Sequence, residues 1–208
     1  MNHFILIRYN INLYSTNPYN IENRDDWMRE RENLFKWYTL PSLSGQIQHN
    51  FKVIVFVDPK TPEVFTQNIE YMLLHEDLEY SIVKNNIPAY CIRDKWNIYT
   101  RLDNDDMISP TFTMDVQNFV LQHPGEEYLI DFKGIQVDVM ANKQYTDGRT
   151  RPNSPFCSIV TKDKRIFDYQ HTDLPDHFEN AVKLDKIGYY QILHYNNIAN
   201  KPKGEEIK

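Results

Sequence analysis

The chain has 208 residues, of which 41% are hydrophobic, and it carries 23 Lys and Arg against 29 Asp and Glu. This length can bury a substantial core and is short enough for one domain, while a net charge of -6 offers no general attraction to nucleic acid. Two cysteines without CxxC spacing, no signal peptide at Met1 and no membrane-length apolar run indicate a soluble protein of the cytoplasm, or of the host cytoplasm if the source is a virus.

Short apolar strands and amphipathic helices alternate in the first half of the chain. Phe4–Ile7 and Val53–Val57 are wholly apolar, as is typical of strands buried on both faces of a parallel sheet. Between them, Trp27–Tyr38 repeats apolar residues at helical spacing, and we expect this helix to end near Pro41.

The second strand is followed directly by a helix start. Thr61 is the predicted N-cap, Pro62 takes the first helical position, and an apolar face continues to Leu73. Tyr80–Val83 and Trp96–Leu102 are the next predicted strands.

Ser109-Pro110 opens a further predicted helix, which Pro124-Gly125 closes. Strands that alternate with helices imply a largely parallel sheet that binds ligands beyond the carboxyl ends of its strands. Arg8, Asp58 and Asp103 each follow or end such a strand, so we expect them to gather at one edge.

The second half has a different pattern. Tyr128–Asp131 and Gly134–Met140 read as antiparallel strands that turn at Phe132-Lys133, and a loop with Asp147-Gly148 follows. We therefore predict a single domain over 1–208, with a nucleotide-binding half at 1–106, an acceptor-facing half at 107–200 and a frayed polar tail at 201–208.

An acidic cluster, Thr100-Arg101-Leu102-Asp103-Asn104-Asp105-Asp106, ends the last strand of the first half. Carboxylates one residue apart at a strand end can hold a divalent cation and a ribose together. The alternative is a plain turn, since Asp and Asn are turn formers. An EF-hand is excluded, because Ile108 and Met114 stand where its Gly and Glu are required. The polar groups at three strand ends favour the metal site over the turn.

Five segments resemble the rhamnosyltransferase-like family of GT-A glycosyltransferases, and together they cover nearly the whole chain. They are residues 4–10, residues 31–35 with 41–43 and Gln46, residues 55–58, residues 99–106, and residues 188–194 with Asn197. The chain is short for that family, and Tyr189-Tyr190 stands where a Trp is often expected. The resemblance implies an α/β fold of GT-A (Rossmann-like) type, with a mixed, mostly parallel central sheet flanked by helices, in an enzyme that is complete here or is one part of a longer multidomain protein.

The resemblance also implies roles for the acidic cluster. Asp105 would bind Mn²⁺ or Mg²⁺ directly, and Asp103 would contact the ribose and the metal shell, so that these two residues carry the catalysis. His194 would complete the metal shell, with an ordinary strand-end histidine as the alternative. His171 is the second candidate for this histidine, although we expect it to contact a phosphate or the acceptor instead.

Three further residues are expected to contact the donor. By the same resemblance, Asp58 would accept a hydrogen bond from the base ring, although Asp-Pro also simply ends strands. Arg8 and Arg101 could pair with the diphosphate through their planar guanidinium groups. For Arg101, an ion pair with its acidic neighbours is the alternative.

The catalytic base and the stereochemical outcome stay open. An inverting transferase needs a carboxylate near the acceptor hydroxyl, whereas a retaining one need not use that arrangement. The sequence does not rank the candidates of the acceptor-facing half, which are Asp131, Asp138, Asp168, Asp173 and Asp176.

We expect a metal-dependent glycosyltransferase that moves a hexose or deoxyhexose from a UDP- or dTDP-sugar to a glycan or glycoprotein acceptor. One alternative is a sugar-phosphate nucleotidyltransferase, which normally has a Gly-rich loop after its first strand, whereas residues 8–15 contain no Gly. The other is a non-catalytic carbohydrate-binding module that stacks sugars on some of the 14 Tyr, 11 Phe and 3 Trp side chains.

Overall fold

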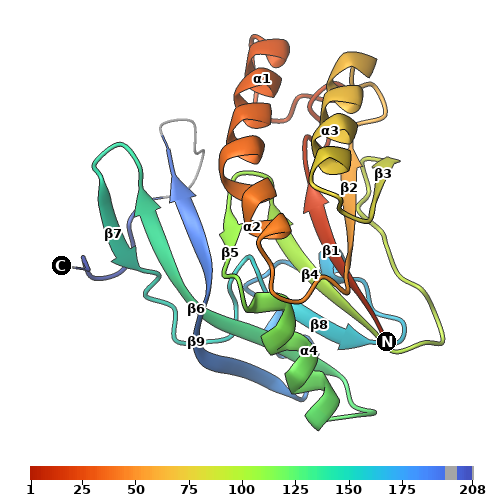
Figure 1. The fold of residues 1–208 in the computed structure, drawn as a ribbon, viewed down its shortest axis with the longest axis vertical. Helices are drawn as coiled ribbons and strands as arrows, with labels where there is room; N and C mark the ends of the chain where they lie inside the picture. Colours follow the sequence, from red (N-terminus) through yellow and green to blue (C-terminus); the bar gives the residue numbers. More distant parts are fainter. Residues whose placement is uncertain (195–200, 208) are drawn as a thin grey trace.

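The computed structural model describes residues 1–194 and 201–207 (Figure 1). Within these residues, nine strands form one sheet in the order β3-β2-β1-β4-β8-β6-β9-β5, and β7 pairs with β6. The strands are β1 Asn2–Arg8, β2 Lys52–Val57, β3 Tyr80–Lys84, β4 Asn97–Asp103, β5 Met107–Ile108, β6 Tyr128–Asp138, β7 Lys143–Thr146, β8 Ser158–Thr161 and β9 Ala181–Leu193. The helices are α1 Arg24–Leu34, α2 Leu40–Ser44, α3 Glu63–His75 and α4 Phe112–Gln122, with a π-helix η1 Phe35–Thr39 and 3-10 helices η2 Ile166–Asp168 and η3 Leu174–His177.

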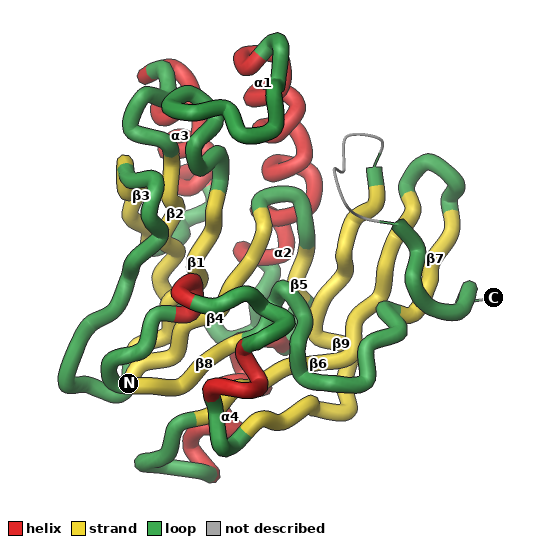
Figure 2. Tube along the Cα trace, turned by 180° about the vertical axis from the view of Figure 1, so that it is seen from behind, coloured by secondary structure: helices red, strands yellow, loops and turns green. Residues whose placement is uncertain are grey.

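Two apolar layers sandwich the sheet. On one face, side chains of β1 and β2 belong to one apolar cluster with side chains of α1, α3 and α4. Figure 1 shows these helices in front of the sheet. On the other face, alternate side chains of the same strands pack against Ile166, Leu174 and Phe178 in the segment that lies in front of the sheet in Figure 2. Because both faces are covered, Ile5, Leu6 and their neighbours are fully buried, which accounts for their wholly apolar sequence.

The parallel half of the sheet matches the sequence prediction. Strands β3, β2, β1 and β4 pair in parallel and match the four predicted segments, except that β4 begins at Asn97, one residue after the predicted start at Trp96. Arg8 ends β1 directly opposite Asp103, the last residue of β4. The pairing register of β1 and β4 therefore places Arg8 and Asp103 side by side.

The first helical segment continues beyond the expected end at Pro41. A π-helical turn, η1, follows α1, and α2 then runs to Ser44 with Pro41 in its first turn. A proline is tolerated in a first turn, where its missing N–H is needed least. The prediction that the helix ends near Pro41 was wrong. The π-helical turn η1 is followed directly by α2, which begins at Leu40, one residue before the proline.

Thr61 is not the N-cap of α3, which begins at Glu63 after Pro62. The Thr61 hydroxyl instead donates to the backbone oxygen of Asp58 at 2.7 Å and accepts from Asn10 Nδ2 at 2.9 Å. It closes the turn between β2 and α3 and ties it to the loop after β1.

The predicted hairpin at Phe132-Lys133 was also wrong. These residues lie inside β6, which pairs with β9 in parallel and with β8 and β7 antiparallel. The register of β6 against β9 shifts around Lys133, so an irregular stretch rather than a turn marks this point. Residues 128–132 are buried, and burial on both faces keeps the strand extended where the polar Lys133 suggested a turn.

The polar tail is ordered against β7 over residues 203–207. Thr146 N donates to Glu205 O at 2.9 Å, and Ile207 N donates to Gln144 O at 2.8 Å. An edge strand offers unpaired backbone groups, and here the tail satisfies them, which corrects the expectation of a frayed end.

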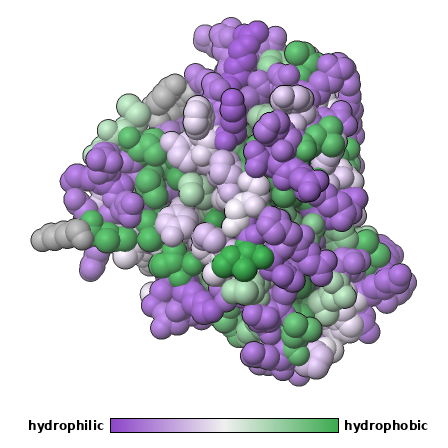
Figure 3. Space-filling view, in the orientation of Figure 1, coloured by the Kyte–Doolittle hydropathy of each residue, from purple (hydrophilic) through white to green (hydrophobic). Residues whose placement is uncertain are grey.

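The surface over the helices is mainly hydrophilic, with apolar residues scattered singly across it (Figure 3). Among the described residues, no helix is both long enough and apolar enough to cross a membrane.

Candidate active site

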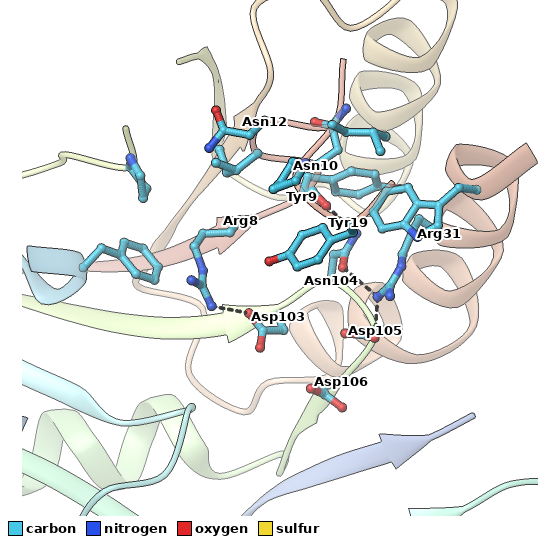
Figure 4. A pocket seen from close by; sticks show the side chains of 16 residues that line it. Arg8, Tyr9, Asn10, Asn12, Tyr19, Arg31, Asp103, Asn104, Asp105 and Asp106 are labelled. Atoms are coloured by element: carbon cyan, nitrogen blue, oxygen red, sulfur yellow. Dashed lines mark hydrogen bonds and ion pairs between the residues drawn. The ribbon is translucent and has the colours of Figure 1, made fainter. Parts of the chain in front are cut away.

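A pocket of about 520 Å³ opens where β1 and β4 end (Figure 4). Its floor is the acidic cluster, and its walls come from the loop after β1, from α1 and from η2. The lining residues are Arg8, Tyr9, Asn10, Ile11, Asn12, Leu13, Pro18, Tyr19, Trp27, Arg31, Pro88, Asp103, Asn104, Asp105, Asp106 and Phe167. Arg8 and Asp103 therefore lie together at this edge of the sheet, as predicted. Cationic and aromatic side chains from other parts of the chain complete the lining of the pocket.

The three carboxylates of the acidic cluster have different surroundings. Asp103 has a side chain that is 35% exposed and forms an ion pair with Arg8 at 3.3 Å. Asp105 is buried, and its Oδ2 accepts from Arg31 and, at 3.0 Å, from His194 Nε2. Burial raises the pKa of Asp105, but the hydrogen bond from His194 and the charge of Arg31 outweigh it and bring the pKa below its usual range.

Asp106 is the structural member of the cluster. Its Oδ1 accepts from the backbone N–H of Ile192 at 2.6 Å, which joins the cluster to β9. Burial, with the negative charges of Asp105 and Asp103, raises the pKa of Asp106 well above its usual range.

Replacing Asp106 by Asn should flatten the pH dependence of stability. The raised folded-state pKa means that wild-type stability falls as pH rises above about 4, whereas Asn cannot ionise. We expect the melting temperature of wild type to drop relative to Asp106→Asn by at least about 2–4 °C between pH 5 and pH 8, or about 1 kcal/mol. Parallel melting curves across this range would contradict the expected ionisation.

His194 follows β9 and lies against Asp105, as the metal-shell prediction requires. Its side chain is only 5% exposed. The other residue of that segment, Asn197, lies outside the described residues.

Arg31 is the site residue that the sequence analysis missed. It belongs to the last turn of α1, and its Nη1 contacts Asp105 Oδ2 and lies 3.4 Å from Asn104 Oδ1. Its Cζ stacks 4.8 Å from the ring centre of Trp27, four residues earlier. This i,i+4 pairing of Arg and Trp was the available signal, but Arg31 sits in a run of charged residues that resembles a solvated helix face.

Arg8 and Arg101 converge on one aromatic ring. Their Cζ atoms lie 5.0 and 4.9 Å from the ring centre of Phe167. Arg101 is buried, and its Nε and Nη1 have no hydrogen-bond partner. Within the described part of the chain, Arg101 forms no ion pair, so the predicted alternative of a pair with its acidic neighbours is not observed. Its contact with a diphosphate stays a prediction.

Asp58 does not join the pocket. Its carboxylate is fully buried and accepts from Tyr14 N, Ser15 N, Ser15 Oγ and Lys60 N at 2.7 to 3.1 Å. These donors outweigh burial and lower its pKa. Asp58 therefore holds the pocket-forming loop after β1 in place, which supports its structural alternative, and a base contact stays a prediction.

His171 also lies outside the lining of the pocket. Its Nδ1 is 2.7 Å from Asn153 O, which makes it the donor to that carbonyl. Burial lowers its pKa, and the positive charges of Arg101 and Arg149 add to this effect. Its contact with a phosphate or with the acceptor stays a prediction.

None of the five candidate bases, all within the described residues, lines the pocket. Asp131 is fully buried and accepts from Ser154 N at 2.9 Å, and its raised pKa results from that burial. Asp138 accepts from backbone groups of the turn after β6, and Asp173 accepts from Thr172 Oγ1. Asp168 and Asp176 form surface ion pairs with Arg165 and Arg151. The base therefore stays unassigned.

Two residues of the resemblance anchor the segment that follows the acidic cluster. Gln46 Nε2 donates to Ser42 O at 2.7 Å and to Ser109 O at 2.8 Å, and its Oε1 accepts from Thr113 N. Ser42 Oγ accepts from the backbone N–H of Ile108. The segment after the cluster is thereby fixed to α2.

Asp105 and His194 are the two residues that were predicted to bind the metal directly or to complete its shell. Carboxylate oxygens and an imidazole nitrogen are ligand types that Mn²⁺ accepts, and Asp105 and His194 are already in contact. Among the described residues, no three His, Cys, Asp or Glu side chains are arranged as a complete metal cage. Asp105 and His194 are the two predicted ligands that the structure brings into contact, so a metal bound by them would need further ligands, and the metal stays a prediction.

Solved structures with a similar fold come from S. aureus TarS. A structure of TarS 1-349 in complex with UDP-GlcNAc aligns with a TM-score of 0.50 and 18% identity, over 95% of this chain and 60% of that chain. A structure of TarS 1-349 in complex with UDP aligns with a TM-score of 0.50 and 18% identity, over 93% of this chain and 61% of that chain. The chain thus spans about 60% of the length of these neighbours, and the likeness confirms the expected α/β fold.

No curated protein matches the chain. The family described as "Putative rhamnosyl transferase" matches residues 19–206, which is most of the chain. This range includes α1 with Arg31, the acidic cluster and His194, so the family match spans most of the pocket. The chain therefore belongs to this family of glycosyltransferases.

Proposed function

We propose that the protein transfers a hexose or deoxyhexose from a UDP- or dTDP-sugar to a hydroxyl of a glycan or glycoprotein, with Mn²⁺ or Mg²⁺. The observation that carries this proposal is the pocket at the ends of β1 and β4. It combines the carboxylates of Asp103 and Asp105 with the cations Arg8 and Arg31, under walls that include Tyr19 and Trp27.

The pocket offers separate chemistry for each part of such a donor. Tyr19 and Trp27 present aromatic rings that can stack on a base. Arg8 and Arg31 supply planar guanidinium groups that match phosphate oxygens. Asp103, which is partly exposed, can accept hydrogen bonds from ribose hydroxyls.

Asp105 and His194 would hold the metal, with Asp103 at its outer shell. When bound, the metal neutralises charge that develops on the leaving nucleoside diphosphate. The chain's own residues orient the donor: α1 positions Arg31, the parallel register positions Arg8, and Asp58 holds the loop that forms the wall.

We further propose a cytoplasmic setting. Cys91 and Cys157 are both free thiols, as expected of a reducing compartment.

Metal-dependent donor binding tests the proposal. The TarS 1-349 structures contain UDP-GlcNAc and UDP, so UDP-sugars are the first donors to try, followed by dTDP-sugars. At a donor concentration of about 100 Kd, the folded state should gain about 2.7 kcal/mol, which corresponds to several degrees in melting temperature. The shift should require Mn²⁺ and vanish in EDTA.

Two outcomes would overturn this function. Absence of a metal-dependent shift with every UDP- and dTDP-sugar would exclude the donor class. Glycan binding that is insensitive to EDTA, without hydrolysis of any donor, would instead support the carbohydrate-binding alternative.

A further inference from the structure

Arg31 occupies the oxygen of the acidic cluster that a metal ion would use. Its guanidinium forms an ion pair with Asp105 Oδ2, and the same oxygen accepts from His194 Nε2 at 3.0 Å. The side chains of Arg31 and Asp105 are only 11% and 9% exposed. A cation that belongs to the chain is therefore already bound at the predicted metal ligand.

The position of Arg31 is set by α1, as Figure 4 shows. Trp27 lies one turn earlier on the same helix and supports the guanidinium with its ring, 4.8 Å from Cζ. Asn104 Oδ1 lies 3.4 Å from Arg31 Nη1 and helps to orient the guanidinium group. By contrast, Arg29 of the same helix pairs with Asp26 at the surface and is 65% exposed.

A metal ion and the Arg31 guanidinium would compete for Asp105 Oδ2. Two cations at hydrogen-bond range of one carboxylate repel each other strongly in a site with little solvent. In the pocket, however, a diphosphate would offer oxygens that match the guanidinium fork and would compensate the charge of both cations.

We propose that Arg31 is an internal counter-ion of Asp105 that is exchanged for a divalent metal ion when the diphosphate of the donor enters. Arg31 opposes metal binding in the donor-free protein and binds the diphosphate in the complex. The inference rests on the proposed function and adds an order to it: metal and donor enter together, and a donor-free enzyme holds the metal weakly.

Mn²⁺ binding to the full chain tests this order without measuring activity. The EPR signal of free Mn²⁺ gives its Kd, with and without saturating UDP, for wild type, Arg31→Gln, Arg31→Lys and the matched control Arg29→Gln. In wild type and Arg29→Gln, UDP should tighten Mn²⁺ binding at least about tenfold, a typical coupling between two ligands. In Arg31→Gln, Mn²⁺ alone should bind about tenfold tighter than in wild type, and the effect of UDP should shrink to about threefold or less.

Arg31→Lys separates charge from geometry. It keeps the cation beside Asp105, so Mn²⁺ alone should bind as weakly as in wild type. Melting curves of each variant establish that it is folded, and Arg31→Lys provides the comparison if Arg31→Gln does not fold. In that case, tighter binding of Mn²⁺ alone to Arg31→Lys than to wild type would overturn the proposal.

The remaining outcomes separate this inference from the function on which it rests. If UDP tightens Mn²⁺ binding equally in wild type and Arg31→Gln, the exchange is wrong while the proposed donor site stands. If neither protein binds Mn²⁺ in the presence of UDP, both the exchange and the metal-dependent function are overturned.

Discussion

Replacing Asp105 by Asn should lower kcat/KM for sugar transfer by about 10²–10³-fold or more, which is the usual effect of removing one preorganised electrostatic group from an active site. Asp105 Oδ2 is the meeting point of Arg31, His194 and the proposed metal, so the substitution removes the negative charge on which all three depend. Donor hydrolysis and transfer rates at several Mn²⁺ concentrations measure the loss.

Asp103→Asn is the matched comparison. Asp103 is partly exposed, and within the described residues its ion pair is with Arg8, so we expect a smaller loss, of about 10-fold to 100-fold. Asp105→Asn also leaves Arg31 buried beside a neutral side chain, which destabilises the fold, so rates are compared below both melting temperatures. A variant at Asp105 that keeps more than about a tenth of wild-type kcat/KM would contradict the assigned role.

The sequence was sufficient for the parallel half of the fold because its signals are local. Residues 4–7 and 53–57 are apolar on both faces, and only a strand covered on both sides uses such a pattern. Once β1 and β4 are parallel neighbours, Arg8 and Asp103 must lie at the same edge. That part of the site follows from strand order alone.

The rest of the site depends on contacts between distant segments. Arg31 is separated from Asp105 by 74 positions, and only the Trp27 ring four residues earlier distinguishes its local sequence from that of an exposed arginine of α1 such as Arg29. Asp58 follows a strand as Asp103 does, but the loop at residues 14–15 wraps around its carboxylate. Whether a strand-end carboxylate faces the pocket or caps a turn is decided by the loop that reaches it, which periodicity does not reveal.

The second half was harder because its strands are long and irregular. Phe132-Lys133 looks like a turn in the sequence, whereas the chain stays extended there and uses the next residue, Gly134, for a close approach to β9. Glycine occurs both in turns and where two strands approach each other closely, and only the packing around it distinguishes the two cases.

Replacing Gly134 by Ala should destabilise the protein by about 3 kcal/mol, or about 6–12 °C in melting temperature. A Cβ at this position would overlap the Tyr189 ring, with Cδ2 at 2.7 Å and two further ring carbons closer. The ring cannot move away easily, because it is buried, packs 4.5 Å from the ring of Phe156 and donates its hydroxyl to Asp147.

Two comparisons isolate the cause of this loss. Gly125→Ala also adds a methyl group, but at φ +86° with no atom within 4 Å, so it should cost only about 1 kcal/mol of backbone strain. In a Tyr189→Ala background, Gly134→Ala should cost much less than in wild type, because the ring that it meets is gone. Equal costs in both backgrounds would show that the overlap with Tyr189 is not the reason.

The same substitution should reach the pocket. Strand β9 carries the Ile192 N–H that binds Asp106, and His194 at its end binds Asp105. A displacement of β9 against β6 therefore shifts both partners of the acidic cluster, and Gly134→Ala should weaken Mn²⁺-dependent UDP binding even below its melting temperature. Gly125→Ala, in the turn after α4, should leave that binding unchanged. Unaltered binding in folded Gly134→Ala would mean that β9 yields near Tyr189 without moving its end, and the acidic cluster would then keep its place without a contribution from that part of β9.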